Sequence, residues 1–314
     1  MSNGNRLPQS LIEAVRYFDD PDVCVDFVAG IRWPDGPECP VCGGKEFSYL
    51  TTRRLWKCKA CKKQYSVKLG TIFEDSAIPL DKWLVSIWLI ANAKNGISSY
   101  ELGRAVKISQ KSAWHVLHRI RLAMQIGNFD RFDGETETDE TFVGGTGRFM
   151  HNNKKAKVMN GPGGWGHKAV VVGTVQRGTD GKVSKVRAAV VPARTNEHLV
   201  GHVRETVEPG ASVYTDMHKA YNVLADEYDH ETVDHIAEYV RGRVHTNGIE
   251  NFWTLLKRGL KGTYVNADPV HLFRFVDERV FTFNERDKND LGRFVLVVTA
   301  SVGRRLTWAD LTGR

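Results

Sequence analysis

Two close pairs of cysteines limit what this chain can fold into more than any other feature. Cys39 and Cys42 form one pair, Cys58 and Cys61 form the other, and fifteen residues separate the two C-x2-C motifs. Four thiolates with these spacings can close a tetrahedral shell around one zinc ion. A closed shell leaves no open coordination position, so the sequence predicts a zinc ribbon with one structural Zn²⁺. The alternative is four free, buried thiols.

Cysteine usage also bears on the cellular compartment. Paired cysteines of this kind suit metal binding in a reducing compartment better than a disulfide framework. The N-terminus, MSNGNRLPQS, has no apolar signal core, and no apolar run approaches the length that spans a bilayer. We therefore expect a cytoplasmic protein. The fifth cysteine, Cys24, lies in an apolar stretch, and we interpret it as buried.

Basic residues are concentrated around the cysteine pairs. The chain has 314 residues and a net charge of +7, and from Cys39 to Lys68 its only acidic residue is Glu46. Such a concentration of positive charge favours a polyanionic partner such as DNA. The candidate DNA contacts in this segment are Arg53, Arg54, Lys57, Lys62 and Lys63. A purely structural role for the segment, or contact with another protein, is the alternative.

Residues 79–127 carry a helical pattern that contains a helix-turn-helix candidate. Ser98 can cap one helix with Glu101 three positions later, as in a capping box, and Ser109 can cap a second helix. The N-terminal end of such a second helix is where a recognition helix meets base edges. The residues at that end are Gln110, Lys111 and Trp114. The alternative is an ordinary helical hairpin.

From Glu135 onward, strand-like and helix-like patterns alternate, which predicts an α/β domain. The strand candidates are residues 135–143, 169–176, 185–191 and 211–216, and the helix candidates are 195–207 (capped by Thr195), 217–228, 246–260 and 269–286. The Gly-, Asn- and Lys-rich stretch 144–168 is too long for an ordinary connection, so we interpret it as functional or mobile. Its candidate DNA contacts are Lys154, Lys155, Lys157, Trp165 and Lys168.

Three acidic residues of this domain occupy positions suited to metal binding. Asp139 lies in the first strand, Asp216 ends a buried strand that leads directly into a helix, and Glu250 lies on a helix 34 residues later. Carboxylates at strand ends project into the crevice where such sheets place ligands. Together the three acids could hold two magnesium ions about 4 Å apart, an arrangement that cleaves phosphodiesters. Each acid taken singly could equally be a helix cap or a solvated charge.

Several choices at this site stay open on the residues alone. Glu140 follows Asp139 and would point to the opposite face of a strand, but the alternation does not settle which of the two faces the site. His218 and His245 flank the acids and could contact phosphate or be structural. Polar residues spaced i, i+3, i+7 and i+10 share one face of the last helix: Asn247, Glu250, Thr254 and Lys257.

With these features the chain resembles the insertion-sequence DDE transposases that carry an N-terminal zinc ribbon and an ISXO-like transposase domain. The matching stretches are CPVCGG, CKACKKQYSVKLGTIFEDSAIPLDKW, TDETFVGG, GWGHK, VYTDMHKAY, VHTNGIENFWTLLKRG and FTFNER. They span about residues 39–286, which is nearly the whole chain, and several of them are long and specific.

The resemblance implies an RNase H-like catalytic domain that holds two Mg²⁺ or Mn²⁺ ions per active site through an Asp, Asp, Glu triad. By the motif match, the triad falls on Asp139, Asp216 and Glu250. Lys257, seven residues past Glu250, matches the basic residue that the family places on the same helix, and with Arg258 it is a candidate DNA contact. Some relatives have asparagine in the third acidic place, so Asn247 and Asn251 are lesser candidates.

The resemblance also implies a function. It is that of a DNA transposase that binds the terminal inverted repeats of an insertion sequence and catalyses metal-dependent strand cleavage and transfer into target DNA. Such a protein would act as a homodimer or higher homo-oligomer and lie with the prokaryotic nucleoid when on DNA. The alternatives are a non-catalytic zinc-ribbon DNA-binding regulator derived from a transposase and an RNase H-like nuclease.

The expected organisation has five segments. They are an N-terminal helical segment (1–32), a zinc ribbon (33–70), a helix-turn-helix segment (79–127), an RNase H-like transposase domain (135–290) and a C-terminal tail (291–314).

Overall fold

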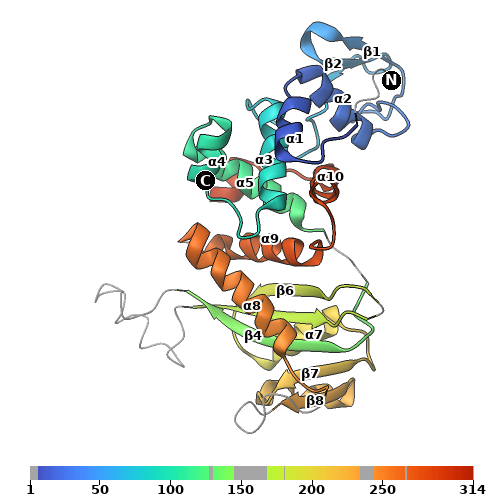
Figure 1. Cartoon of the computed structure of the whole chain (residues 1–314). Helices are drawn as coiled ribbons and strands as arrows, with labels where there is room; N and C mark the ends of the chain where they lie inside the picture. The colour runs from blue at the N-terminus through green and yellow to red at the C-terminus, as the bar shows by residue number, and fades with distance from the viewer. Residues whose placement is uncertain are drawn as a thin grey trace. The chain divides into compact units, whose positions relative to one another are not determined.

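The computed structural model describes residues 6–126, 130–144, 168–179, 181–233, 243–265 and 267–313 (Figure 1). The chain forms two compact units: Met1–Ile126 together with Lys288–Arg314, and Gly127–Asp287. The candidate DNA contacts Lys154, Lys155, Lys157 and Trp165 lie outside the described residues. Within the described residues, no helix has the length and apolar character needed to cross a membrane.

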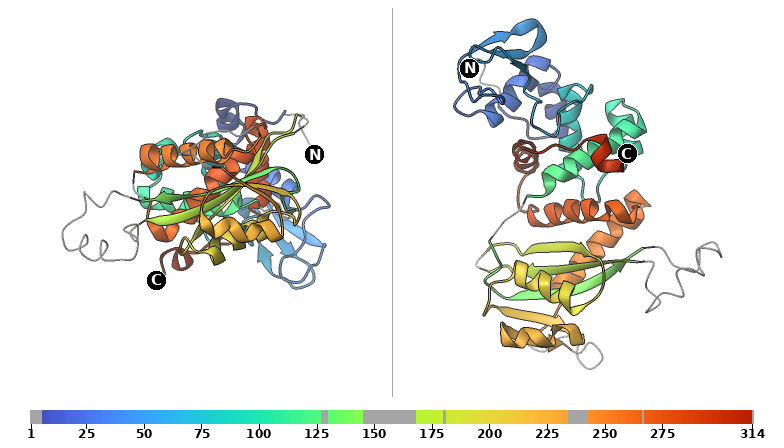
Figure 2. Two further views of the ribbon diagram at one scale, coloured as in Figure 1. Left: turned by 90° about the horizontal axis from the view of Figure 1, so that it is seen from below. Right: turned by 180° about the vertical axis from the view of Figure 1, so that it is seen from behind.

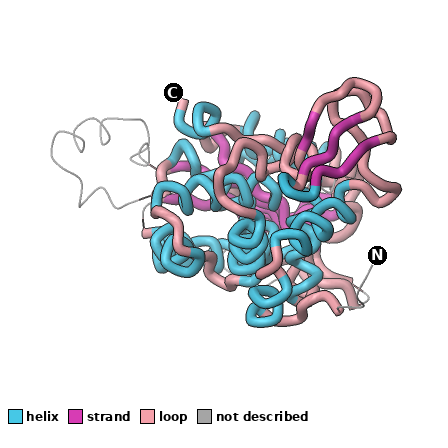
Figure 3. The backbone as a smooth tube through the Cα atoms, turned by 90° about the horizontal axis from the view of Figure 1, so that it is seen from above, coloured by secondary structure: helices cyan, strands magenta, loops and turns pink. Residues whose placement is uncertain are grey.

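The first unit begins with two short helices, which lie within the predicted helical segment 1–32, and a ribbon of short strands (Figure 3). The helix α1 (Leu11–Tyr17) starts at Ser10, whose side chain accepts a hydrogen bond from a backbone N–H. The helix α2 (Pro21–Arg32) starts at Asp20 and has its proline in the first position, where no N–H is needed. The ribbon is an antiparallel sheet in the order β1 (Phe47–Leu50), β2 (Leu55–Cys58) and β3 (Gln64–Tyr65), with the 3-10 helix η1 (Thr51–Arg53) between its first two strands.

The predicted helix-turn-helix pair is present in the same unit. The pair consists of α4 (Ser99–Val106) and α5 (Gln110–Met124). The helix α3 (Leu80–Asn92) precedes the pair. Ser98 and Glu101 form the capping box at the start of α4, and Ser109 caps α5. A Cβ atom on Gly103 would lie 3.0 Å from the carbonyl oxygen of Ile108, so the turn passes close to α4 at this glycine.

The segment 291–314 is not the tail that we expect from the sequence. It forms α10 (Asp290–Ala300) and α11 (Trp308–Thr312), which belong to the first unit. Phe294 of α10 is fully buried, and its ring lies 5.1 Å from that of Trp88 on α3. Arg119 of α5 donates a hydrogen bond of 2.8 Å to the carbonyl oxygen of Leu306, 187 positions away. Contacts between such distant segments leave no local pattern in the sequence.

A mixed sheet of five strands, counted over the described residues, forms the centre of the second unit (Figure 1). Its order is β6 (Lys185–Val191), β5 (Ala169–Gln176), β4 (Thr136–Val143), β7 (Ser212–Asp216) and β8 (Asp229–Val233). The pairs β4–β5 and β5–β6 are antiparallel, whereas β4–β7 and β7–β8 are parallel. The strands β4 to β7 match the four predicted strands to within one residue at each end. The edge strand β8 reads DHETV and lacks the apolar pattern that would reveal it.

Helices cover both faces of this sheet, which confirms the predicted α/β class (Figures 1 and 2). One face packs on α8 (Asn247–Gly259) and α9 (Leu272–Asn284), which the π-helix η4 (Leu260–Tyr264) and the 3-10 helix η5 (Pro269–His271) connect. The other face packs on α7 (Asn196–Thr206) and the 3-10 helix η3 (Lys219–Asp226). Because successive strand residues point to opposite faces, Val171 packs under α8 and Val172 under α7.

Two local predictions on the α7 side differ from the structure. Thr195 does precede α7, but its hydroxyl pairs with the ring of His198 at 2.6 Å and, among the described residues, makes no capping bond to a backbone N–H. Residues 217–228, predicted as a helix, form the 3-10 helix η3 over a shorter range.

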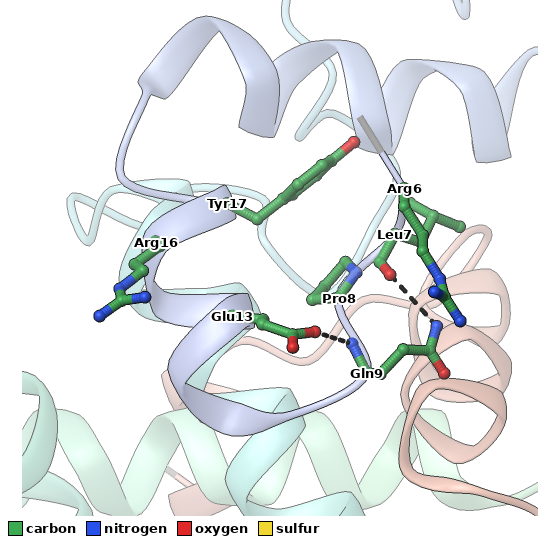
Figure 4. Close-up of a pocket in the computed structure, with 7 residues that line it drawn as sticks. All are labelled: Arg6, Leu7, Pro8, Gln9, Glu13, Arg16 and Tyr17. Atoms are coloured by element: carbon green, nitrogen blue, oxygen red, sulfur yellow. Dashed lines mark hydrogen bonds between the residues drawn. The ribbon is translucent and has the colours of Figure 1, made fainter. Parts of the chain in front are cut away.

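A cavity of about 570 Å³ lies in the first unit beside the segment before α1 (Figure 4). Its lining consists of Arg6, Leu7, Pro8, Gln9, Glu13, Arg16 and Tyr17. The backbone N–H of Gln9 donates a 2.7 Å hydrogen bond to the carboxylate of Glu13, which draws this segment back against α1. None of these lining residues is a predicted site residue.

Candidate active site and zinc centre

The four cysteines of the ribbon converge on one point. Their sulfur atoms all lie within 4.8 Å of one another, and the Sγ···Sγ distance is 3.6 Å both for Cys39–Cys61 and for Cys42–Cys58. Tetrahedral zinc with Zn–S bonds of about 2.3 Å requires sulfur atoms about 3.8 Å apart. The four side chains therefore fit a structural Zn²⁺.

Local backbone geometry prepares this cluster for metal. Gly43 has a φ of +71°, a conformation that turns the chain back after the first pair of cysteines. Hydrogen bonds from the backbone N–H groups of Cys61 and Ala60 lower the pKa of the Cys58 thiol to about 7. The pKa of the Cys42 thiol instead rises to about 12, because the lowering effect of the Gly44 backbone hydrogen bond is outweighed by the other three cysteines. A lowered thiol pKa favours the thiolate, which is the form that binds zinc.

The basic residues of the ribbon that are predicted to contact DNA differ in solvent exposure and in their ion pairs. Arg53, Lys57, Lys62 and Lys63 are exposed. Arg54 is half-buried, and its Nε lies 2.5 Å from a carboxylate oxygen of Asp22 on α2. Arg54 therefore also joins the ribbon to the helix before it.

The predicted recognition end of α5 is partly covered by the C-terminal helix. Gln110 and Lys111 are exposed, and the Lys111 ammonium lies 4.7 Å from the ring centre of Trp308 on α11. Trp114 is half-buried, because its ring meets Trp308 edge-on at 5.7 Å and His118 at 4.5 Å. Gln110 and Lys111 are thus better placed than Trp114 to reach base edges.

In the second unit, two of the three predicted acids lie side by side. The parallel register places Thr138 of β4 opposite Thr215 of β7, so the next residues, Asp139 and Asp216, stand at neighbouring positions of the sheet. A carboxylate oxygen of each lies within 4.8 Å of the other and of Glu140. Carboxylate oxygens are the ligands that magnesium and manganese prefer, so this cluster suits a divalent cation.

Asp139 and Glu140 contact different helices, although carboxylate oxygens of the two lie within 4.8 Å of each other. Asp139 accepts a hydrogen bond of 2.9 Å from the indole N–H of Trp253 on α8. Glu140 accepts one of 2.8 Å from the hydroxyl of Tyr221 on η3, on the other side of the sheet, and pairs with the guanidinium of Arg194. The strand alternation that the sequence leaves unresolved therefore directs Asp139, not Glu140, toward α8.

The electrostatics of Asp139 reflect this crowding. Burial raises its pKa to about 7, and the negative charges of Glu140 and Asp216 contribute to the rise. Lys257 lies one turn of α8 beyond Trp253. Burial lowers the pKa of Lys257, and electrostatic attraction to the Asp139 carboxylate opposes that change.

The third predicted acid stands apart from the cluster. Glu250 is exposed in the first turn of α8, where its carboxylate accepts a 3.3 Å hydrogen bond from the hydroxyl of Thr246. Within the described residues, Glu250 is not among the acids that share the 4.8 Å cluster. Asn247 and Asn251 are exposed on the same helix, as is Arg258.

Three further side chains at the site are not predicted from the sequence. Trp253 contacts Asp139, and Arg194 lies between Glu140 and Asp216, with its Nη2 3.8 Å from an oxygen of the latter. Glu137 occupies the same face of β4 as Asp139 and contacts the start of α8. Arg194 lies in the connection between β6 and α7, and only the tertiary fold brings it here.

The two histidines that flank the acids have structural contacts. The N–H of His218 donates to Asp216 at 3.0 Å, and its ring accepts from the backbone of η3. His245 contacts Arg177 through its ring at 3.0 Å and through its carbonyl oxygen at 2.9 Å.

Comparison with known proteins identifies the family. A family model described as the ISXO2-like transposase domain matches residues 131–284, and one described as the transposase zinc-ribbon domain matches residues 20–64. An uncharacterized transposase-like protein of Haemophilus influenzae is 32% identical over 104 residues, which cover 33% of this chain and 84% of that protein. The chain belongs to the ISXO2-like transposase family.

A second relative of this transposase covers more of the chain. It is an uncharacterized protein in transposable element ISH50 of Halobacterium salinarum, 28% identical over 247 residues, or 75% of this chain and 81% of that protein. The zinc-ribbon match contains all four clustered cysteines, and the transposase-domain match contains Asp139, Asp216 and Glu250. The second unit of this transposase thus has the predicted RNase H-like fold.

Proposed function

We propose that this transposase binds the terminal inverted repeats of its insertion sequence and catalyses divalent-metal-dependent DNA cleavage and strand transfer. The observation that carries the proposal is the pair of carboxylates on neighbouring strands, Asp139 and Asp216, within 4.8 Å of each other in the family-matched domain. Mg²⁺ or Mn²⁺ held there, two ions per site, would activate the attacking water or 3′-hydroxyl and stabilise the leaving oxygen.

Glu250 is the proposed third ligand. Glu140 is buried and pairs with Arg194 and Tyr221, whereas Glu250 is exposed and matches the third acidic position of the family motif. Glu250 also lies on the helix whose Trp253 contacts Asp139. Asn247 and Asn251 are the lesser candidates on the same helix.

Lys257 and Arg258 are the proposed DNA contacts of the catalytic domain. A protonated lysine is a poor metal ligand but a good donor to phosphate. Lys257 is close enough to Asp139 for their charges to interact, so a phosphate bound by Lys257 would lie near the acid cluster.

The first unit is the proposed reader of the transposon ends, through the zinc ribbon (33–70) and the helix-turn-helix (79–127). The exposed side chains that support this are Arg53, Lys57, Lys62, Lys63, Gln110 and Lys111. Cations that contact phosphates release counterions, so end binding should weaken steeply as salt rises. We propose 135–290 as the catalytic domain, acting in a homodimer or higher oligomer on DNA.

The test incubates the purified protein with its element's end DNA and Mg²⁺ or Mn²⁺. New 3′ ends and their joining to target DNA are measured, with chelator as the control. Asp139→Asn and Asp216→Asn should abolish cleavage and leave end binding nearly intact. Cleavage without joining would indicate a nuclease, and end binding without cleavage would indicate a regulator.

Matched substitutions settle the third ligand and the DNA contacts. Glu250→Gln is compared with Glu140→Gln, Asn247→Ala and Asn251→Ala. We expect Glu250→Gln to abolish cleavage. If Glu250→Gln still cleaves and either Asn247→Ala or Asn251→Ala does not, the third ligand is that asparagine. Lys257→Ala should reduce cleavage while Mn²⁺ binding is retained.

A further inference from the structure

The buried carboxylate of Glu137 lies two residues before Asp139 on β4. Its side chain is only 2% exposed. It accepts hydrogen bonds from the backbone N–H groups of Gly248 at 2.6 Å and Ile249 at 3.0 Å, and from Nε of Arg177 at 2.8 Å. A carboxylate with this many donors is held in one position.

The first turn of α8 depends on this contact. The opening N–H groups of any helix lack partners within the helix, and a capping side chain usually supplies one. The residue at the capping position of α8 is Thr246, whose side chain makes no capping hydrogen bond within the described part of the chain. Glu137 supplies the acceptor from the sheet instead, where its negative charge also suits the positive end of the helix dipole.

Gly248 permits this approach. A Cβ atom at this position would lie 2.8 Å from Oε2 of Glu137, closer than such atoms come in real structures. Glycine is otherwise unfavourable inside a helix, so close contact with the carboxylate gives a physical reason for its presence.

A second contact ties the same helix to the same strand. Glu137 and Asp139 are two residues apart and therefore face the same side of the sheet. Asp139 accepts from Trp253, one turn farther along α8 than the residues that Glu137 holds. Glu250 lies between these two points of attachment. These two contacts therefore fix the position of α8 along the direction of β4.

Arg177 connects Glu137 to the residues that precede α8. Its Nη1 donates to the carbonyl oxygen of Arg243 at 2.6 Å, and its Nη2 donates to that of His245 at 2.9 Å. Because Arg177 also binds Glu137, one carboxylate organises both the approach to α8 and its first turn.

We propose that Glu137 is a positioning residue of the active site: by fixing the first turn of α8 on β4, it holds the helix that carries Trp253 and Glu250 against the strand that carries the metal-binding Asp139. The inference rests on the proposed function only for the role of Glu250. Groups that orient metal ligands without touching the metal commonly contribute 10- to 100-fold to metal affinity.

The experiment measures Mn²⁺ binding to the full chain by electron paramagnetic resonance, and cleavage of end DNA as a function of Mn²⁺ concentration. Glu137→Gln should weaken Mn²⁺ binding roughly 10-fold or more and shift the half-maximal Mn²⁺ concentration by the same factor. Binding of end DNA, which we assign mainly to the first unit, should change less than about twofold.

Glu135→Gln is the matched control. Glu135 lies on the same face of the same segment and contacts Arg177 at 3.3 Å and Arg243 at 2.8 Å, while its described hydrogen bonds include none to α8. The control should bind Mn²⁺ like the native chain. Equal losses in Glu135→Gln and Glu137→Gln would overturn the proposal, because they would reflect general loss of charge.

Gly248→Ala keeps the carboxylate and displaces it sterically, so it tests the contact even if Glu137→Gln folds poorly. It should reproduce the loss of Mn²⁺ affinity, and the double variant should be no worse than the weaker-binding single variant, because both changes break one contact. Native affinity in Gly248→Ala, or additive losses, would overturn the proposal. Absence of cleavage by the native chain would refute the proposed function and leave the Mn²⁺ comparison intact.

Discussion

Replacing His202 by glutamine should remove much of the acid sensitivity of the second unit. His202 is buried on α7, and burial lowers the pKa of its ring from an ordinary value of 6.5 to about 4, with the nearby positive charge of Arg187 adding to the decrease. The imidazole is therefore neutral in the folded protein at pH values where it is charged in the unfolded chain.

The sign and size of the effect follow from this difference. Between pH 6.5 and 4 the unfolded chain binds more protons than the folded one, so the free energy of unfolding falls as the pH falls. With pKa values of 6.5 unfolded and about 4 folded, His202 costs about 1.4 kcal/mol at pH 5.5 and about 3 kcal/mol at pH 4, relative to pH above 7.

Urea unfolding of native and His202→Gln protein at pH 7.5 and 5.5 measures the effect, with hydrogen exchange of the α7 amides to assign it to the second unit. The native protein should lose about 1.4 kcal/mol more than the variant on acidification. His202→Leu, which changes the packing differently, should show the same reduced pH dependence. An equal loss in native and variant proteins would refute the reasoning.

Three other predictions test the zinc centre, the first-unit core and the acid cluster. Replacing Cys39 and Cys42 together by serine should abolish bound zinc in metal analysis of purified protein; full zinc content would contradict the four-cysteine site. Phe294→Ala should lower the free energy of unfolding of the first unit by about 3–5 kcal/mol in urea titrations, and a loss below about 1 kcal/mol would exclude α10 from the core. Gly173→Ala places a Cβ atom 2.7 Å from the ring of Trp253, so it should displace that ring and weaken Mn²⁺ binding, and native Mn²⁺ affinity would contradict the clash.

Features that depend on short stretches of chain were predictable. The capping box needs only Ser98 and Glu101 three positions apart, and the structure forms it. The spacing of Cys39 and Cys42 likewise fixes one side of the metal cluster. Asp216 was predictable as a candidate ligand because it ends a strand, whereas Asp139 lies within β4 and is brought beside it by the β4–β7 register.

Features that depend on distant contacts were not predictable. The helical pattern predicts that Trp114 is exposed and able to contact DNA. In the structure it packs against Trp308 of α11, which lies near the other end of the sequence. Arg194 lies in a connection with no distinctive pattern, and the fold places it against Glu140. The strand β4 reads TETDETFV, with polar residues on both faces, so its alternation does not show which face packs on α8.

The acids of β4 differ in how their charges are compensated, and this difference supports Asp139 as the proposed metal ligand among them. Glu137 and Glu140 each pair with a guanidinium, from Arg177 and Arg194 respectively. Among the described residues, Asp139 accepts instead from the neutral indole of Trp253 and pairs with no cation at salt-bridge distance. Asp139 is partly buried, and its desolvation together with the negative charges of Glu140 and Asp216 raises its pKa to about 7. A divalent cation offsets these effects by binding the charged form, so the acid with the least compensated charge is the one best suited to be a metal ligand.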